Sequence, residues 1–166
     1  MSALAGFVRS HLASSQVARV IYGAIIGLAL VVALEAHPPP AGAVVASLLG
    51  TSVAVALAEL YSETLGTEVR TRTRVGAERR HAIREDMVAV AFGVSFPAVF
   101  FVLAAAGATD VDTAFDLAKW SGLGVIGFYG FCAARLSGTG LTMALFKGGA
   151  AALIGAFLIA LKALLH

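Results

Sequence analysis

The sequence is poor in charge and in cysteine. Only 13% of its 166 residues are Asp, Glu, Lys or Arg, roughly half the share found in soluble domains, which excludes an ordinary water-soluble domain. The single cysteine, Cys132, cannot form a disulfide within the chain. The chain opens without the segment order of a removable signal peptide. It also lacks a nucleophile–base pair, so we expect no enzymatic activity.

Long apolar runs occupy most of the chain. Hydrophobic residues make up 59% of the sequence, and the mean hydropathy is +0.89. This composition predicts an all-α polytopic membrane protein, with one crossing for each run of about 20 apolar residues. Three adjacent prolines, Pro38 to Pro40, end the first run and allow an abrupt reversal. We expect five transmembrane helices in a domain of residues 17–166, at about 20–36, 41–60, 87–108, 118–134 and 143–165.

Two segments are expected to lie outside the bilayer. Residues 1–16 place apolar side chains at helical spacing, which predicts an amphipathic surface helix, with a disordered tail as the alternative. Residues 61–86 carry six arginines and five acids. If the N-terminus is cytoplasmic, ten Lys and Arg residues lie inside and two outside. We therefore expect a plasma (inner) membrane protein with segment 61–86 in the cytoplasm and the C-terminus outside.

Small residues mark the fourth and fifth spans. Helices in lipid associate through close packing, which small side chains permit. We interpret these residues as packing positions and not as a phosphate-binding loop. They are Gly122, Gly124, Gly127 and Gly130 in the fourth span, and Gly148, Gly149, Ala152 and Gly155 in the fifth.

Glu59 is the first candidate for ion chemistry. A carboxylate at the centre of a membrane is costly and is usually functional. Counted from Ala41, Glu59 lies about 27 Å along the second span, near the far edge of a ~30 Å hydrocarbon core. It is therefore either a ligand on an ion path or the point where a helix emerges into water, with Tyr61 as an aromatic anchor. Glu63 stands one turn further out and is a weaker metal candidate.

A second candidate metal site lies in the arginine-rich segment. Glu78, His81 and Glu85 share one helical face, and Glu-x-x-His is a spacing used by carboxylate-bridged di-iron bundles. The interleaved arginines disfavour a cation there. The alternative is an exposed helix held by Glu–Arg pairs and attracted to anionic lipid headgroups. The arginines that would contact the headgroups are Arg70, Arg72, Arg74, Arg79, Arg80 and Arg84.

Three further positions could contribute to an ion path. Pro97, within the third span, can kink the helix and free a carbonyl group as a polar lining. Tyr22, in the first span, is a candidate lining residue or an ordinary membrane aromatic. Glu35 and His37 form either an exit site for the ion or a hydrated helix end. The three prolines place them in a surface turn, which favours the hydrated helix end.

The order of several short motifs resembles the vacuolar iron transporter family. The similar segments are Tyr22-Gly23-Ala24-Ile25-Ile26-Gly27-Leu28, Glu59-Leu60-Tyr61-Ser62, Phe96-Pro97, and residues 135–155 with their small-residue pattern. The resemblance covers about residue 17 to the end. It implies five helices per protomer, a homodimer with the ion path at its interface, and exchange of Fe²⁺ or Mn²⁺ for protons.

The chain departs from this family at two ligand positions. Ile26 stands where the family has a metal-binding aspartate, and Val55 where it has a methionine thioether. Neither side chain can replace the water shell of a divalent cation. Two interpretations follow, a divalent cation transporter and a membrane scaffold or accessory subunit that keeps the fold without the ions. Under both interpretations we expect a homodimer embedded in the lipid bilayer and no binding of nucleic acid. The scaffold interpretation adds an unidentified membrane protein as a partner.

Overall fold

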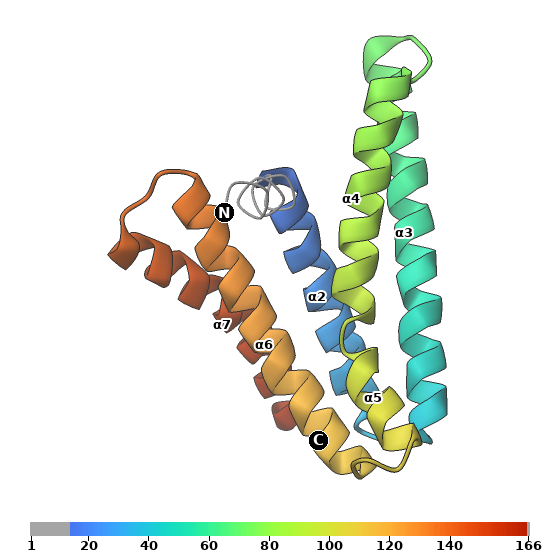
Figure 1. Ribbon diagram of the computed structural model, residues 1–166, viewed down its shortest axis with the longest axis vertical. Coiled ribbons are helices and arrows are strands. Elements are labelled where there is room, and N and C mark those ends of the chain that lie inside the picture. Colours follow the sequence, from blue (N-terminus) through green and yellow to red (C-terminus); the bar gives the residue numbers. More distant parts are fainter. Residues whose placement is uncertain (1–13, 166) are drawn as a thin grey trace, which may run out of the picture.

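A computed structural model describes residues 14–165, and within this range helices are joined by short turns and no strand is present (Figure 1). The expected surface helix of residues 1–16 lies almost wholly outside the described residues. The described helices are α2 (Ser14–Leu34), α3 (Ala41–Thr71), α4 (Ala77–Ser95), α5 (Ala98–Ala105), α6 (Val111–Leu136) and α7 (Leu141–Leu165).

The expected count of five membrane crossings is not confirmed by the composition of these helices. Within the described residues, three helices are long and apolar enough to cross a membrane, at Gln16–Leu34, Ala41–Thr71 and Leu141–Leu161. The α4–α5 pair raises the count to four if it forms one bent span. α6 is long enough at 26 residues, but Lys119, Trp120 and its glycines lower its apolar content.

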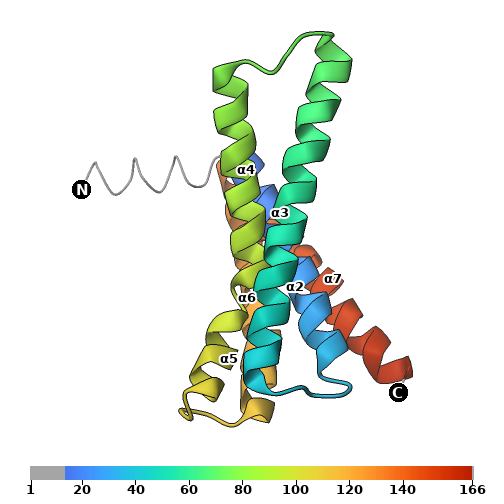
Figure 2. The ribbon, with the colours of Figure 1, turned by 90° about the vertical axis from the view of Figure 1, so that its right-hand side faces the viewer.

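α3 and α4 form a helical hairpin that stands well beyond the ends of the other helices (Figures 1 and 2). α3 continues without a break through the polar residues after Glu59 and ends at Thr71. Its 31 residues make it about 46 Å long, more than a ~30 Å hydrocarbon core requires. Residues 72–76 form the turn, and α4 returns from Ala77. We call residues 60–85 the arm.

Pro97 divides the predicted third span into two helices. α4 ends at Ser95 and α5 begins at Ala98, and their axes differ by 47°. A proline has no N–H to donate and its ring clashes with the preceding turn, which explains a bend at this residue. The predicted kink is thus present. The Pro97 side chain is buried, so it packs inside the protein.

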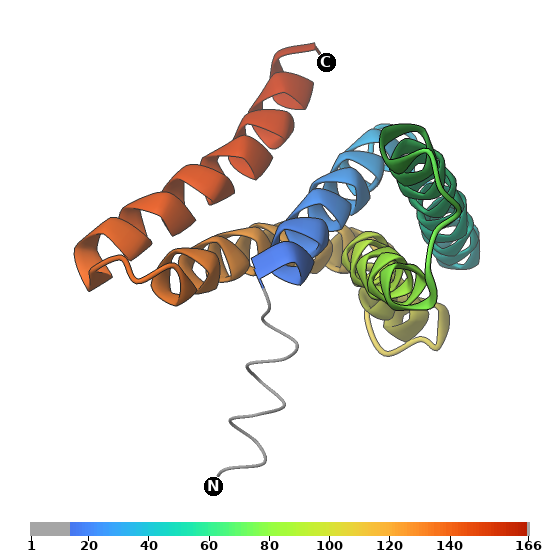
Figure 3. The ribbon, with the colours of Figure 1, turned by 90° about the horizontal axis from the view of Figure 1, so that it is seen from above.

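α2 lies at the centre of the bundle. It contacts α3, α4, α6 and α7, and Figure 3 shows α2 and α6 between α7 on one side and the α3–α4 pair on the other. The inner side chains form two apolar clusters. One gathers Val31, Leu48, Phe101 and Phe115 near α5, and the other surrounds Leu28 and Ile126 between α2 and α6.

Glycines bring the backbones of α2 and α4 into direct contact. A methyl group on Gly23 would lie 2.2 Å from the carbonyl oxygen of Val90, and one on Gly93 would lie 2.5 Å from that of Val20. Gly27 has a similar approach to Val94. Such distances leave no room for any side chain, so this crossing depends on glycine at all three positions.

The predicted small-residue contact between α6 and α7 is present for some of its members. A methyl group on Gly148 would meet the carbonyl oxygen of Gly127 at 2.8 Å, and one on Gly130 would meet the Cβ of Ala151 at 2.9 Å. Gly124 and Gly149 face open space instead. The prediction was therefore wrong for these two, because they face the open groove beside the contact.

The α5–α6 loop ends in a helix cap. The Asp110 carboxylate accepts hydrogen bonds from the Thr113 backbone N–H at 2.7 Å and from its hydroxyl at 2.8 Å. These bonds hold the pKa of Asp110 below its usual 3.8 because they stabilise the charged form. The capped end fixes where α6 begins.

The α2–α4 crossing can be tested with a single methyl group. We expect Gly93→Ala to destabilise the protein by about 1–3 kcal/mol, because the backbones of α2 and α4 must separate. Gly50→Ala in α3 is the matched control, since nothing lies within 4 Å of its added methyl group. It should be neutral or stabilising by about 0.5–1 kcal/mol. Unfolding of both variants in mixed detergent micelles measures the difference, and equal stabilities would refute the close crossing.

Candidate functional site: a carboxylate cluster around Arg19

The guanidinium group of Arg19 in α2 joins acids from two other helices. It donates a hydrogen bond to Glu59 of α3. Its Nη2 lies 3.8 Å from Glu63 Oε2, one turn further along α3. Its Nε lies 3.7 Å from Asp86 Oδ2 of α4. Arg19 therefore connects α2 to both helices at the level where the arm begins.

The cluster is partly shielded from water. The side chains of Glu59 and Asp86 are 13% and 11% exposed, and that of Arg19 is 29% exposed. Arg79 of α4 donates a second hydrogen bond to Glu63. Three carboxylates thus share two guanidinium groups, which leaves a formal charge of −1. The opposite charges attract one another more strongly here than at the surface because less water screens them, and removal of one partner would leave a shielded charge unpaired.

A smaller charged cluster lies at the opposite end of α2. Lys119 Nζ of α6 lies 2.5 Å from Glu35 Oε1 and 3.0 Å from Asp116 Oδ1. Arg19 lies near the start of α2 and Glu35 directly follows its last residue, so the sixteen positions between them place the two clusters about 24 Å apart. This separation is close to the ~30 Å thickness of a hydrocarbon core.

The structure brings Glu59 and Glu63 together but does not join them to the other predicted metal ligands. Of Glu78, His81 and Glu85, only the last two are paired, with His81 Nδ1 3.4 Å from Glu85 Oε1. Both side chains are at least half exposed. Within the described part of the chain, no group of three or more His, Cys, Asp or Glu side chains could hold a metal ion.

The remaining predicted residues divide into paired and exposed ones. Arg79 binds Glu63, and so it is part of the cluster as well as of the arginine-rich segment. The other predicted headgroup contacts, Arg70, Arg72, Arg74, Arg80 and Arg84, are exposed on the arm. Tyr22 is 48% exposed on the surface of α2. His37 is exposed in the turn, whereas Glu35 is held by Lys119.

Sequence reasoning missed Arg19, Asp86 and Lys119 as members of these clusters. In the sequence, Arg19 and Lys119 contribute only to the charge count that predicts the orientation, and Asp86 is the last residue of the polar segment 61–86. One signal was available. Arg19 and Asp86 each border a long apolar run, and a charge in that position needs a partner or the membrane surface.

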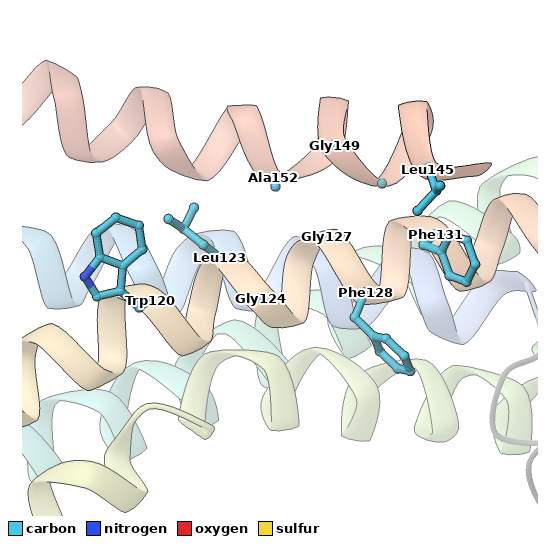
Figure 4. Close-up of a pocket in the computed structure, with 10 residues that line it drawn as sticks. Trp120, Leu123, Gly124, Gly127, Phe128, Phe131, Leu145, Gly149 and Ala152 are labelled. Atoms are coloured by element: carbon cyan, nitrogen blue, oxygen red, sulfur yellow. The ribbon is translucent and has the colours of Figure 1, made fainter. Parts of the chain in front are cut away.

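An open apolar groove runs beside the contact between α6 and α7 (Figure 4). Leu123 and Leu145 point into it, whereas Phe128 points away from α7. Gly124 and Gly149 form part of its floor and wall. No charged side chain lines the groove, so it offers no donors to a cation.

Comparison with known proteins adds no identification. A scan against protein-family models and searches of curated proteins and of solved structures find no match to this chain.

Arg19 can be tested as the centre of the cluster. We expect Arg19→Gln to destabilise the protein by about 1–3 kcal/mol, because Glu59, Glu63 and Asp86 then repel one another without a central cation. Arg84→Gln is the matched control, since Arg84 is exposed on α4, and it should change stability by less than about 0.5 kcal/mol. Unfolding in mixed micelles measures both, and adding Glu59→Gln to the Arg19 variant should restore part of the loss. Equal effects of the two arginine substitutions would contradict a cluster centred on Arg19.

Proposed function

We propose that this chain is an integral membrane scaffold that crosses the bilayer five times and holds a rigid helical arm at its cytoplasmic surface. In this proposal it keeps a fold like that of the vacuolar iron transporter family without the family's ion chemistry. The observation that carries the proposal is the set of contacts made by Arg19, which connect the carboxylates of Glu59, Glu63 and Asp86.

Charge positions support α6 as the additional crossing. Lys119 of α6 pairs with Glu35 at the end of α2, so these two helices share one boundary level. Arg135 follows Lys119 by sixteen positions, or about 24 Å of helix, the same spacing as Arg19 and Glu35 in α2. The loop after α6 lies toward the end of the bundle from which the arm projects (Figure 1). The positive residues of that end favour the cytoplasm.

The Arg19 contacts favour a structural role for Glu59. A divalent cation needs oxygen, nitrogen or sulfur donors in place of its water. Glu59 already accepts a hydrogen bond from the guanidinium group of Arg19. A metal cation would have to displace this group, and the two positive charges repel each other. Ile26 and Val55, at the two positions where the resembled family has metal ligands, have no donor atom in their side chains. The same contacts fix the arm to α2, which is what a scaffold requires.

Proton-coupled transport of Fe²⁺ or Mn²⁺ is the second candidate. The convergence of three carboxylates at the base of the arm favours it, because movement of Arg19 would release oxygen ligands at that point. In a homodimer, two such sets would be present. This candidate needs a state in which Arg19 has left Glu59.

Ion uptake separates the two candidates. We expect vesicles containing the purified protein to accumulate no more Fe²⁺ or Mn²⁺ than empty vesicles at any imposed proton gradient. Glu59→Gln and the exposed-residue control Glu78→Gln should both leave this background unchanged. Uptake by the natural protein that Glu59→Gln abolishes and Glu78→Gln retains would refute the scaffold and establish the transporter.

A further inference from the structure

The groove beside the α6–α7 contact is long and narrow, and we call it the α6–α7 groove (Figure 4). On α6 its lining runs from Trp120 to Phe131, which is eleven positions or about 16 Å of helix. This length is close to half of a ~30 Å hydrocarbon core, the depth of one leaflet. Its volume of about 520 Å³ lies within the range of roughly 300–1,000 Å³ found for small-molecule sites. The groove therefore has room for an extended hydrocarbon chain.

Two glycines keep this groove open. A methyl group added to Gly124 or Gly149 would meet nothing within 4 Å, so neither glycine is needed for the contact between the helices. A glycine in the interior of a helix lowers helix stability relative to alanine. Both positions nevertheless line the groove, where any larger side chain would project into the open space. The glycines at 124 and 149 thus preserve a hollow that packing alone does not require.

A positive charge stands at one end of the groove. Arg135 follows Phe131 by four positions and Gly124 by eleven, and both spacings return to the same side of a helix. Its side chain is exposed, and within the described residues its contact is a hydrogen bond from Nη1 to the carbonyl oxygen of Thr139 at 3.1 Å. A guanidinium group has five N–H donors, so most of them remain available to an anion.

The shape of the groove restricts its occupant. α6 and α7 touch along its floor, where a methyl group on Gly148 would lie 2.8 Å from the carbonyl oxygen of Gly127. A helix of another protein is about 10 Å across, so it can only rest over the mouth of a crevice between two touching helices. A hydrocarbon chain is narrow enough to lie at the bottom.

The charge at the groove end restricts the occupant further. Arg135 lies at the end of the bundle that we propose to face the cytoplasm, and the cytoplasmic leaflet is the one that carries anionic lipids. The walls of the groove carry no charged side chain. An occupant must therefore be apolar along the groove and anionic at the end beside Arg135, which describes an acidic phospholipid.

We propose that the α6–α7 groove holds one acyl chain of an anionic phospholipid of the cytoplasmic leaflet, with the phosphate of that lipid bound by Arg135. Arginine suits this role because its planar group donates two parallel hydrogen bonds to phosphate oxygens. The chain fills the space beside Gly124 and Gly149. This inference rests on the proposed crossing of the bilayer by α6 and adds a lipid partner to the scaffold.

Lipid binding by the purified full-length protein tests the groove. The protein in detergent is titrated with phosphatidylglycerol or with phosphatidylcholine of the same acyl chains, and bound lipid is counted by native mass spectrometry. We expect one tightly held phosphatidylglycerol per chain. Gly124→Leu should lose it, because the leucine side chain occupies the groove. Gly50→Leu is the matched control, since position 50 on α3 is equally open, and it should retain the lipid.

Folding is checked separately in the same detergent. Gly124→Leu should unfold at no lower temperature than the natural protein, because leucine is the better helix former. If that variant does not fold, Gly149→Leu fills the same groove from α7 and replaces it. Retention of the lipid by a folded groove variant, or equal loss from the groove variant and Gly50→Leu, would overturn the inference.

Arg135→Gln tests the site of the headgroup. Its affinity for phosphatidylglycerol should fall about tenfold, the effect of losing one hydrogen bond between charged groups, while its affinity for phosphatidylcholine stays unchanged. Lys147→Gln is the matched control. Lys147 is exposed on α7, roughly 150° around the helix from the centre of its groove-lining residues. An equal loss in the two variants, or an equal loss for the two lipids, would contradict binding of the phosphate at Arg135.

These outcomes are separate from those of the scaffold proposal. Lipid binding is measured in detergent without an ion gradient, so a negative result overturns the lipid site and leaves the ion-uptake prediction as it stands. Uptake of Fe²⁺ or Mn²⁺ would refute the scaffold without emptying the groove.

Discussion

A charged side chain cannot remain in hydrocarbon without a partner, and this constraint organises the molecule. α2 carries Arg19 near one end and Glu35 near the other, and each is paired with residues of other helices. The pairs fix the depth of α2 and join it to α3, α4 and α6. Because α2 also touches α4 through glycine and α7 through side chains, the positions of α3, α4, α6 and α7 follow from that of this one helix.

The sequence predicts the local features of the fold because their causes are local. Apolar runs, the prolines after α2, the bend at Pro97 and the cap at Asp110 each depend on residues a few positions apart. The α2–α4 crossing does not, because it requires Gly23 and Gly93 to meet across seventy positions. Likewise, Arg19 meets Glu59 and Asp86 only after the helices have packed. The continuation of α3 to Thr71 does not follow from the sequence, because its polar residues are equally compatible with a helix and with a loop.

The position of Arg19 changes the interpretation of Glu59. A carboxylate near the edge of a membrane core is compatible with an ion ligand or with an ordinary helix exit, and the sequence leaves both open. The structure adds a third role, in which Glu59 accepts a hydrogen bond from Arg19 and holds the base of the arm. The arm then becomes the distinctive part of the molecule. It carries six arginines and exposes apolar side chains along α3.

The central claim is that the two charged clusters mark the two faces of the bilayer, with α6 crossing between them. Single cysteines at Pro39, Thr73, Ala108 and Gly138 in a Cys132→Ser background test it most directly, with a membrane-impermeant maleimide applied to intact cells. The account predicts labelling at positions 39 and 108 in intact cells, and at 73 and 138 only after permeabilisation. Labelling of 108 and 138 from the same side would show that α6 does not cross, and would contradict the account.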